Sequence, residues 1–431
     1  MNQLKHPLSI DAVKEILAVR KEPNWLAQKR LEAFSAFEKL PMPDSRYTKI
    51  RGLELEKTLP FATPSSKPDF AQLPTGLSDS LTNGADGVLF SQLDSQVFRI
   101  HVSSSLKQQG VIFTDLATAI KEHPDLVQKY LFNAVSPSED KMTALCSAFI
   151  SSGLFIYVPK DVTVKMPLQA LLLMSTPSAG AFTHTVLVAE PGSRVTYLEE
   201  GYSLTGEPAL HAGIAEIYVG EGAQVQYGGI QNWNSSTYNF VRRRAHVARD
   251  ARMNWTIGWL GGKLTMSHVE SQLKGSGAEM EDIQVLFGNG KQHFDLSSAL
   301  RNMAPSVRGE IHLKAVMKDN SRSVVYGFIK VDPAAQRSNS YQLAQGLLLN
   351  DGAHCDAIPG LEIEANDVRA THGASIGPID EEQIFYLQSR GMPKEKAKRA
   401  IVEGFFDPTI EKIPVELVRE RFQSLVQHKW D

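Results

Sequence analysis

The stretch GSRVTY, residues 192–197, has counterparts further along the chain, and their spacing decides the fold. GAQVQY follows at 222–227, DARMNW at 250–255 and GAEM at 277–280, with weaker copies NSRS at 320–323 and GAHC at 352–355. The first four copies recur at a nearly constant interval. A repeat period of about 20–50 residues is typical of solenoids, in which each repeat packs only on its neighbours.

Each of the first four copies begins at a glycine or an aspartate, residues that adopt the left-handed backbone of a tight turn at little cost. The β-rich runs LFIYVP, HTVLVAE, AEIYVGE and SVVYGFIKV also lie between residues 150 and 377, where helical periodicity is nearly absent. We therefore predict a mainly β fold whose core, residues 151–378, is a parallel β-helix. A large antiparallel sheet protein with similar turns stays open as the alternative.

Helical patterns flank this core. Residues 1–85 are expected to form an N-terminal helical region and a loop (57–86), with a helix over 24–40 whose apolar side is Leu26, Leu31, Phe34 and Phe37. Residues 86–150 read as a mixed α/β connection with a helix near 120–134. Residues 379–431 read as a C-terminal helical region: Asp380 with Gln383 resembles a capping box, and Gly391 stands where a helix would end.

The bulk composition excludes several classes of function. Lys and Arg number 45 and Asp and Glu 48, so no basic excess is available for a nucleic acid. The two cysteines, Cys146 and Cys355, are too few for a disulfide framework and point to a reducing compartment. The most apolar run, 168–174, is far shorter than the roughly 20 residues of a spanning helix. We expect a cytoplasmic protein that does not enter the membrane.

Two motifs resemble catalytic signatures, but the spacing or the residues around each one do not match the rest of the signature. GASIG, residues 373–377, matches a serine-hydrolase elbow, but Pro378 follows it and only His428 lies downstream as a candidate base. GWLGGKLT, residues 258–265, resembles a phosphate loop, but its glycine spacing is one residue short and Leu264 separates Lys263 from Thr265. No convincing pair of carboxylates indicates a glycosidase either. The sequence predicts no enzyme.

Cys355, His354 and His372 are candidate metal ligands. The interval from His354 to His372 is close to one coil of a solenoid, so the two segments are expected to stack on adjacent coils. Neighbouring residues on a strand face opposite sides, so His354 and Cys355 cannot point the same way. A thiolate with imidazoles suits iron, zinc or an iron–sulfur cluster. No CxxC pair is present, so the alternatives are a half-site completed by another subunit and a Cys355 that is merely buried.

The C-terminal half of the chain resembles the SufB/SufD family, scaffold subunits of the Suf iron–sulfur cluster assembly machinery. The likeness covers roughly residues 150–406. It rests on the runs LLLNDGAHCDAIP (347–359), LEIEANDV (361–368), THGASIG (371–377) and DEEQIFYLQSRG (380–391), with SVVYGFIKV (323–331) upstream. Within the family the chain is more similar to SufD, because it has two cysteines and has His372-Gly373 where SufB-like chains have His-Glu. The resemblance implies a right-handed parallel β-helix between helical regions.

The resemblance also implies partners and a site. A SufB subunit would pair with the final β-helix strands, and a SufC ATPase would bind the C-terminal helical region; self-pairing as a homodimer stays open. The nascent iron–sulfur cluster would be held transiently and shared with SufB, with no cofactor tightly bound to the isolated chain. His372 matches the histidine proposed to hold that cluster, but Ala370 stands where many SufD chains have a cysteine, which leaves Cys355 as the nearby thiol. The SufC-facing residues would be Asp380, Phe385, Tyr386, Arg390, Gly391 and Phe405.

Overall fold

The computed structural model describes residues 7–63, 73, 77, 88–411 and 416–430. Its helices are α1 (Ile10–Arg20), α2 (Asn24–Lys39), η1 (Leu55–Lys57), α4 (Ser104–Gln108), α5 (Leu116–Glu122), α6 (Pro124–Tyr130), α7 (Lys141–Ala148), α8 (Glu381–Ser389), α9 (Lys394–Ile410) and α10 (Glu416–His428). The strands are β1 (Val88–Leu93), β2 (Gln96–His101), β3 (Ile112–Asp115), β4 (Ser152–Val158), β5 (Leu168–Met174), β6 (Gly180–Ala189), β7 (Arg194–Ser203), β8 (Leu210–Val219), β9 (Gln224–Asn232), β10 (Tyr238–Val247), β11 (Arg252–Trp259), β12 (Leu264–Leu273), β13 (Glu279–Gly288), β14 (His293–Asn302), β15 (Arg308–Met317), β16 (Arg322–Val331), β17 (Asn339–Leu348), β18 (His354–Ile363) and β19 (Arg369–Pro378).

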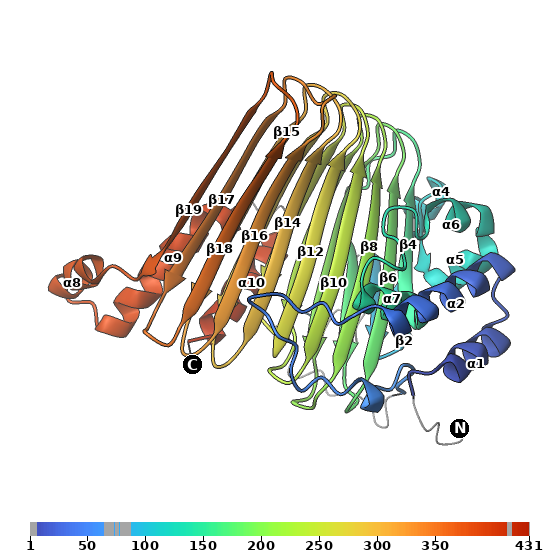
Figure 1. The fold of residues 1–431 in the computed structure, drawn as a ribbon, viewed down its shortest axis with the longest axis horizontal. Helices are drawn as coiled ribbons and strands as arrows, with labels where there is room; N and C mark the ends of the chain where they lie inside the picture. The colour runs from blue at the N-terminus through green and yellow to red at the C-terminus, as the bar shows by residue number, and fades with distance from the viewer. Residues whose placement is uncertain (1–6, 64–72, 74–76, 78–87, 412–415, 431) are drawn as a thin grey trace.

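Two facing sheets make up the central solenoid (Figure 1). The ten-stranded sheet has the order β19-β17-β15-β13-β11-β9-β7-β5-β1-β2, and the nine-stranded sheet has the order β18-β16-β14-β12-β10-β8-β6-β4-β3. From β4 onward consecutive strands alternate between the two sheets, and the strands pair in parallel within each sheet. Each sheet therefore receives one strand per coil. The predicted parallel β-helix is confirmed, and the antiparallel alternative is wrong.

The repeats noticed in the sequence are the turns that enter the ten-stranded sheet. Gly192, Gly222, Asp250 and Gly277 precede β7, β9, β11 and β13, and all four have positive φ, between 53° and 73°. The last residues of the repeats pack inside the solenoid: the Tyr197 and Tyr227 rings lie 5.2 Å apart, and Tyr227 and Trp255 lie 4.9 Å apart. The weaker copies at 320 and 352 precede β16 and β18 and so belong to the nine-stranded sheet, which explains their poorer match.

Helices cover the outer face of the nine-stranded sheet at the N-terminal end (Figure 1). Ser9 caps α1, and α2 confirms the helix predicted over 24–40. Leu26, Phe34 and Phe37 are buried as expected, whereas Leu31, predicted on the same face, is 38% exposed, because the buried stripe runs through Ala33 instead. Pro124 divides the helix expected near 120–134 into α5 and α6. Most of the loop predicted over 57–86 falls outside the described residues.

The C-terminal helices cover part of the outer face of the ten-stranded sheet. Side chains of α9 and α10, including Val402, Phe406 and Phe422, pack with Ile283 and Val285 of β13. The chain passes from β19 directly into α8, which stands beyond the last strands in Figure 1. Among the described residues, no helix is long and apolar enough to span a lipid bilayer.

Candidate functional site at the open end of the solenoid

The C-terminal end of the solenoid is an uncovered pair of sheet edges. β19 is the last strand of the ten-stranded sheet and β18 the last of the nine-stranded sheet, and within the described part of the chain no further strand pairs with either. Most of β19 is exposed, and the second half of β18 is at most half-buried. Apolar side chains on these last strands also reach solvent: Ile363 is 44% exposed and Ile376 38%. Such an edge carries unpaired backbone donors and acceptors and readily accepts another strand.

His372 lies on the inner side of this last coil. Its partner in the strand register is Gln342 on β17, which is 2% exposed and faces the interior. Because partners in register on parallel strands point to the same side of the sheet, the imidazole of His372 is directed to the mouth of the interior. It is exposed only because no coil follows.

Cys355 lies on the inner side of the same coil, on the opposite sheet. Its register partner Ser323 is buried, and Cys355 itself is 7% exposed. A Cβ added to Gly346 would meet Cys355 Sγ at 3.0 Å and Ile376 Cγ1 at 3.1 Å, so the absent side chain of this glycine makes room for both. We call Cys355, His372 and Ile376 the lumen mouth.

Burial raises the pKa of the Cys355 thiol to about 11, and the neighbouring Asp356 carboxylate acts in the same direction. A metal binds the thiolate, so burial disfavours the form of Cys355 that binds a metal. Cys355 is buried in the free chain, so a ligand role would require its thiol to become accessible first. The imidazole of His372, by contrast, is accessible without any such change.

His354 does not join this group. Its side chain is on the outer face of β18, where its Nε2 lies 3.0 Å from Asp356 Oδ2. The expectation that His354 and His372 stack on adjacent coils is wrong, because β18 and β19 belong to different sheets. Residues that stack on adjacent coils are one full coil apart in sequence, as Gln342 and His372 are. The interval from His354 to His372 is shorter than a coil, and over it the chain passes only from one sheet to the other.

Helix α8 carries the polar and aromatic residues expected to face a partner. Asp380 is its N-cap and accepts hydrogen bonds from the backbone N–H groups of Glu382 (2.8 Å) and Gln383 (3.4 Å). Gly391, with φ of +89°, ends the helix as predicted, and the N–H of Met392 donates to the Leu387 carbonyl.

Two aromatic side chains on α8 are exposed. Phe385 is 72% exposed and Tyr386 57%, although both are large apolar side chains. The Arg390 guanidinium lies over the Tyr386 ring, 5.4 Å from its centroid. Phe385, Tyr386 and Arg390 therefore form one accessible patch, which we call the α8 patch. A patch of this composition is typical of protein interfaces.

Phe405, also expected to face a partner, is half-buried against its own solenoid. The Lys314 ammonium lies 4.9 Å from the centroid of its ring and donates a 2.6 Å hydrogen bond to its carbonyl oxygen. Phe405 packs beside Phe406, which is fully buried. The apolar side of α9 is therefore centred on Ala397, Val402 and Phe406, and Phe405 lies at its border.

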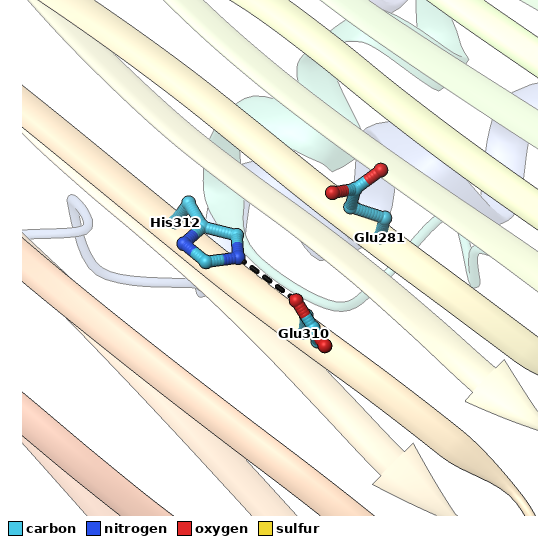
Figure 2. Close-up of side chains that lie close together, drawn as sticks. All are labelled: Glu281, Glu310 and His312. Atoms are coloured by element: carbon cyan, nitrogen blue, oxygen red, sulfur yellow. Dashed lines mark hydrogen bonds and ion pairs between the residues drawn. The ribbon is translucent and has the colours of Figure 1, made fainter. Parts of the chain in front are cut away.

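A group of possible ligands that the sequence analysis missed lies on the outer face of the ten-stranded sheet. The ligand atoms of Glu281, Glu310 and His312 all lie within 4.8 Å of one another (Figure 2). The sequence carries two signals for it: Glu310 and His312 occupy alternate positions of one strand, and Glu281 precedes Glu310 by about one coil. Neither signal indicates a shared site until the sheet register shows that Glu281 and Glu310 are neighbours.

Comparison with known proteins assigns the chain to a family. The SUF system FeS cluster assembly SufBD core domain matches residues 172–405, and the SufBD protein N-terminal region matches residues 84–170. The iron-sulfur cluster assembly protein SufD of Bacillus subtilis is 35% identical over 432 residues, 98% of each chain. Iron-sulfur cluster assembly SufBD family proteins of Staphylococcus saprophyticus and Staphylococcus epidermidis are each 31% identical over 426 residues, 96% of this chain and 91% of theirs.

These matches confirm the resemblance found in the sequence and extend it to nearly the whole chain. The chain therefore belongs to the SufBD family, with a role in iron–sulfur cluster assembly by the Suf system.

Proposed function

We propose that this chain is a non-enzymatic scaffold subunit that pairs through the open end of its solenoid with a SufB-type sister subunit. The observation that carries the proposal is the pair of unpaired edges, β18 and β19, with apolar side chains exposed beside them. A sister solenoid with a similar end would continue both sheets and cover Ile363 and Ile376. Pairing with a second copy of this chain is the alternative occupant of the same edge.

The position of His372 supports a role in holding the nascent cluster. Pairing would enclose the lumen mouth between two subunits, and the imidazole would then stand at the seam. Imidazole nitrogen and thiolate sulfur are both ligands of iron–sulfur clusters, so a cysteine of the sister subunit could complete the site. The iron and sulfide are the cargo of the complex and are held transiently.

The α8 patch supports binding of a SufC-type ATPase. It projects beyond the solenoid on a helix that continues directly from β19, the strand that carries His372 (Figure 1). A force applied to α8 would therefore reach the seam through β19. ATP-driven closure of two SufC subunits would open the seam only if SufC binds the two shapes with different affinity.

The test is co-expression with SufB and SufC, followed by purification and cluster reconstitution. We expect all three proteins to co-purify, His372→Ala to leave the complex intact, and the cluster yield of that variant to fall by at least about tenfold. Ser375→Ala, two strand positions beyond Gly373 on the outer face of β19, is the matched control and should retain full yield. An intact His372→Ala complex with full cluster yield would refute the ligand role and leave a purely structural adaptor, the second candidate, which the buried thiol of Cys355 favours.

A further inference from the structure

The group formed by Glu281, Glu310 and His312 has the composition of a metal site and lies away from the lumen mouth. Glu281 is on β13, and Glu310 and His312 are on β15, all on the outer face of the ten-stranded sheet (Figure 2). His372 belongs to the inner face of the same sheet, two strands further on. The two groups therefore cannot share one ion.

The register of the sheet places two like charges opposite each other. Glu281 and Glu310 are direct Cα partners on adjacent parallel strands. Carboxylates in this relation repel each other, and in a strand pair such a placement costs stability. A cation between Glu281 and Glu310 would remove the repulsion.

His312 is held in place to complete such a site. Its Nε2 lies 3.1 Å from Glu310 Oε2, and its ring packs edge-on against Tyr341, with centroids 6.0 Å apart. The imidazole is 22% exposed and Glu310 57%, so an ion could enter from solvent. Because metal–oxygen and metal–nitrogen bonds are about 2.0–2.2 Å, small rotations of the two glutamates would bring all three ligand atoms to one ion.

We propose that Glu281, Glu310 and His312 bind one divalent first-row transition-metal ion on the outer face of the solenoid. Two carboxylates and one imidazole suit Fe²⁺, Mn²⁺, Co²⁺ and Zn²⁺, and three protein ligands leave further positions for water or an incoming ligand. Ferrous iron is the physiological ion we expect, because the family assembles iron–sulfur clusters. The site would hold iron near the complex before it reaches the seam.

The experiment is a titration of the full-length chain with Co²⁺ under anaerobic conditions, followed by d–d absorption, with Fe²⁺ competing for the same site. We expect one Co²⁺ per chain with the spectrum of a carboxylate–imidazole site. Glu310→Gln and His312→Asn should each weaken binding by more than about tenfold. Both side chains lie on the outer face and reach solvent, so both variants should fold, and circular dichroism verifies this.

The controls separate this site from the lumen mouth and from the general surface. His354 and Asp356 form the same kind of pair on β18, 3.0 Å apart, and so His354→Asn is the matched variant; it should bind Co²⁺ as the unaltered chain does. His372→Ala should also leave this titration unchanged. Equal losses in His354→Asn and His312→Asn would mean an adventitious ion only, and unchanged binding in Glu310→Gln would overturn the proposal. Neither result bears on pairing at the seam.

Discussion

His372 and Gln342 are register partners on the last two strands of one sheet, yet Gln342 is 2% exposed and His372 is open to solvent. Both side chains point to the inner face of the sheet. The last coil covers Gln342, whereas no coil follows to cover His372. Every earlier inward position is covered by the next coil, so the last coil is the place where an interior surface of the solenoid is accessible to a partner. This contrast leads to the first prediction.

Pairing at the open end should protect His372 from chemical modification. In the free chain the imidazole should react with diethyl pyrocarbonate, and addition of the sister subunit should suppress that reaction, as measured by mass spectrometry. His101, exposed on β2 at the opposite end of the ten-stranded sheet, is the control and should react equally in both states. Equal reactivity of His372 in the free and the paired chain would place the seam elsewhere.

A second prediction concerns the turns that carry the repeat. Gly222 has φ of +63° with open space where a Cβ would stand, so Gly222→Ala adds backbone strain without a clash. The left-handed conformation costs an L-residue about 1–2 kcal/mol, and we expect the free energy of unfolding to fall by that amount. Gly222→Asp should cost less, because Asp250 occupies the equivalent turn of the next coil with φ of +53°.

Gly206→Ala provides the control for this series. Gly206 also has open space around a Cβ but lacks a positive φ. The substitution should leave the midpoint of denaturant unfolding unchanged or raise it slightly, since alanine restricts the unfolded chain. A loss at Gly206 equal to that at Gly222 would contradict the conformational explanation.

These turns also show why the fold was predictable from the sequence. The left-handed turn and the inward residues of each coil, such as Val195 and Val225, recur because every coil meets the same local constraint. The β-helix and its helical flanks follow from that repeat and from helix caps such as Asp380. The assignment of His354 and His372 to adjacent coils failed because the repeat gives the length of a coil but not which sheet a strand enters.

The candidate sites were predictable only in part. His372 was identified through family likeness, and only the register placed it on the inner face. The cluster of Glu281, Glu310 and His312 depends on residues one coil apart, whose proximity is set by a register that a local pattern does not reveal. Local patterns thus predict elements, whereas sites built across coils require the stacked structure.

A third prediction concerns the attachment of α10 to the solenoid. Arg421 forms an ion pair with Glu200 of β7, and the side chains are only 3% and 2% exposed. Tyr202 donates a 2.7 Å hydrogen bond to the same carboxylate. Arg421→Met would leave Glu200 buried without its counter-ion, a change that typically costs about 3–5 kcal/mol. We expect the amides of α10 to exchange hydrogen much faster in this variant.

Two further variants test whether the unpaired charge of Glu200 causes the effect of Arg421→Met. Arg421→Met combined with Glu200→Gln should recover part of the lost protection, because the uncompensated charge is then absent. Arg249→Met removes an ion pair with Glu221 whose side chains are 61% and 59% exposed, and it should cost less than about 1 kcal/mol. Unchanged exchange in α10 after Arg421→Met would show that apolar packing alone holds the helix.

The last prediction is a pH dependence of the stability of the folded chain, and it arises from Lys429, just beyond the end of α10. The Lys429 ammonium donates hydrogen bonds of 2.9 Å to the side-chain oxygens of Asn289 and Gln292, both uncharged. Burial, and secondarily the nearby Lys318, lowers the pKa of Lys429 to about 7 from its ordinary value of 10.5. The unfolded chain therefore binds more protons at this residue between pH 7 and 10.5, and the contribution of Lys429 to stability rises with pH across that window.

Comparing the melting temperature of the unaltered chain with that of a variant that lacks the amine separates the contribution of Lys429 from that of other titrating groups. The difference in melting temperature between the unaltered chain and Lys429→Met should shift in favour of the unaltered chain as pH rises from 7 to 9. Below pH 7 the difference should be flat, because the lysine is then charged in both states. Lys14→Met, at an exposed position of α1, should give a difference that does not vary with pH. A constant difference for Lys429→Met as well would mean that its ammonium stays charged when α10 is docked.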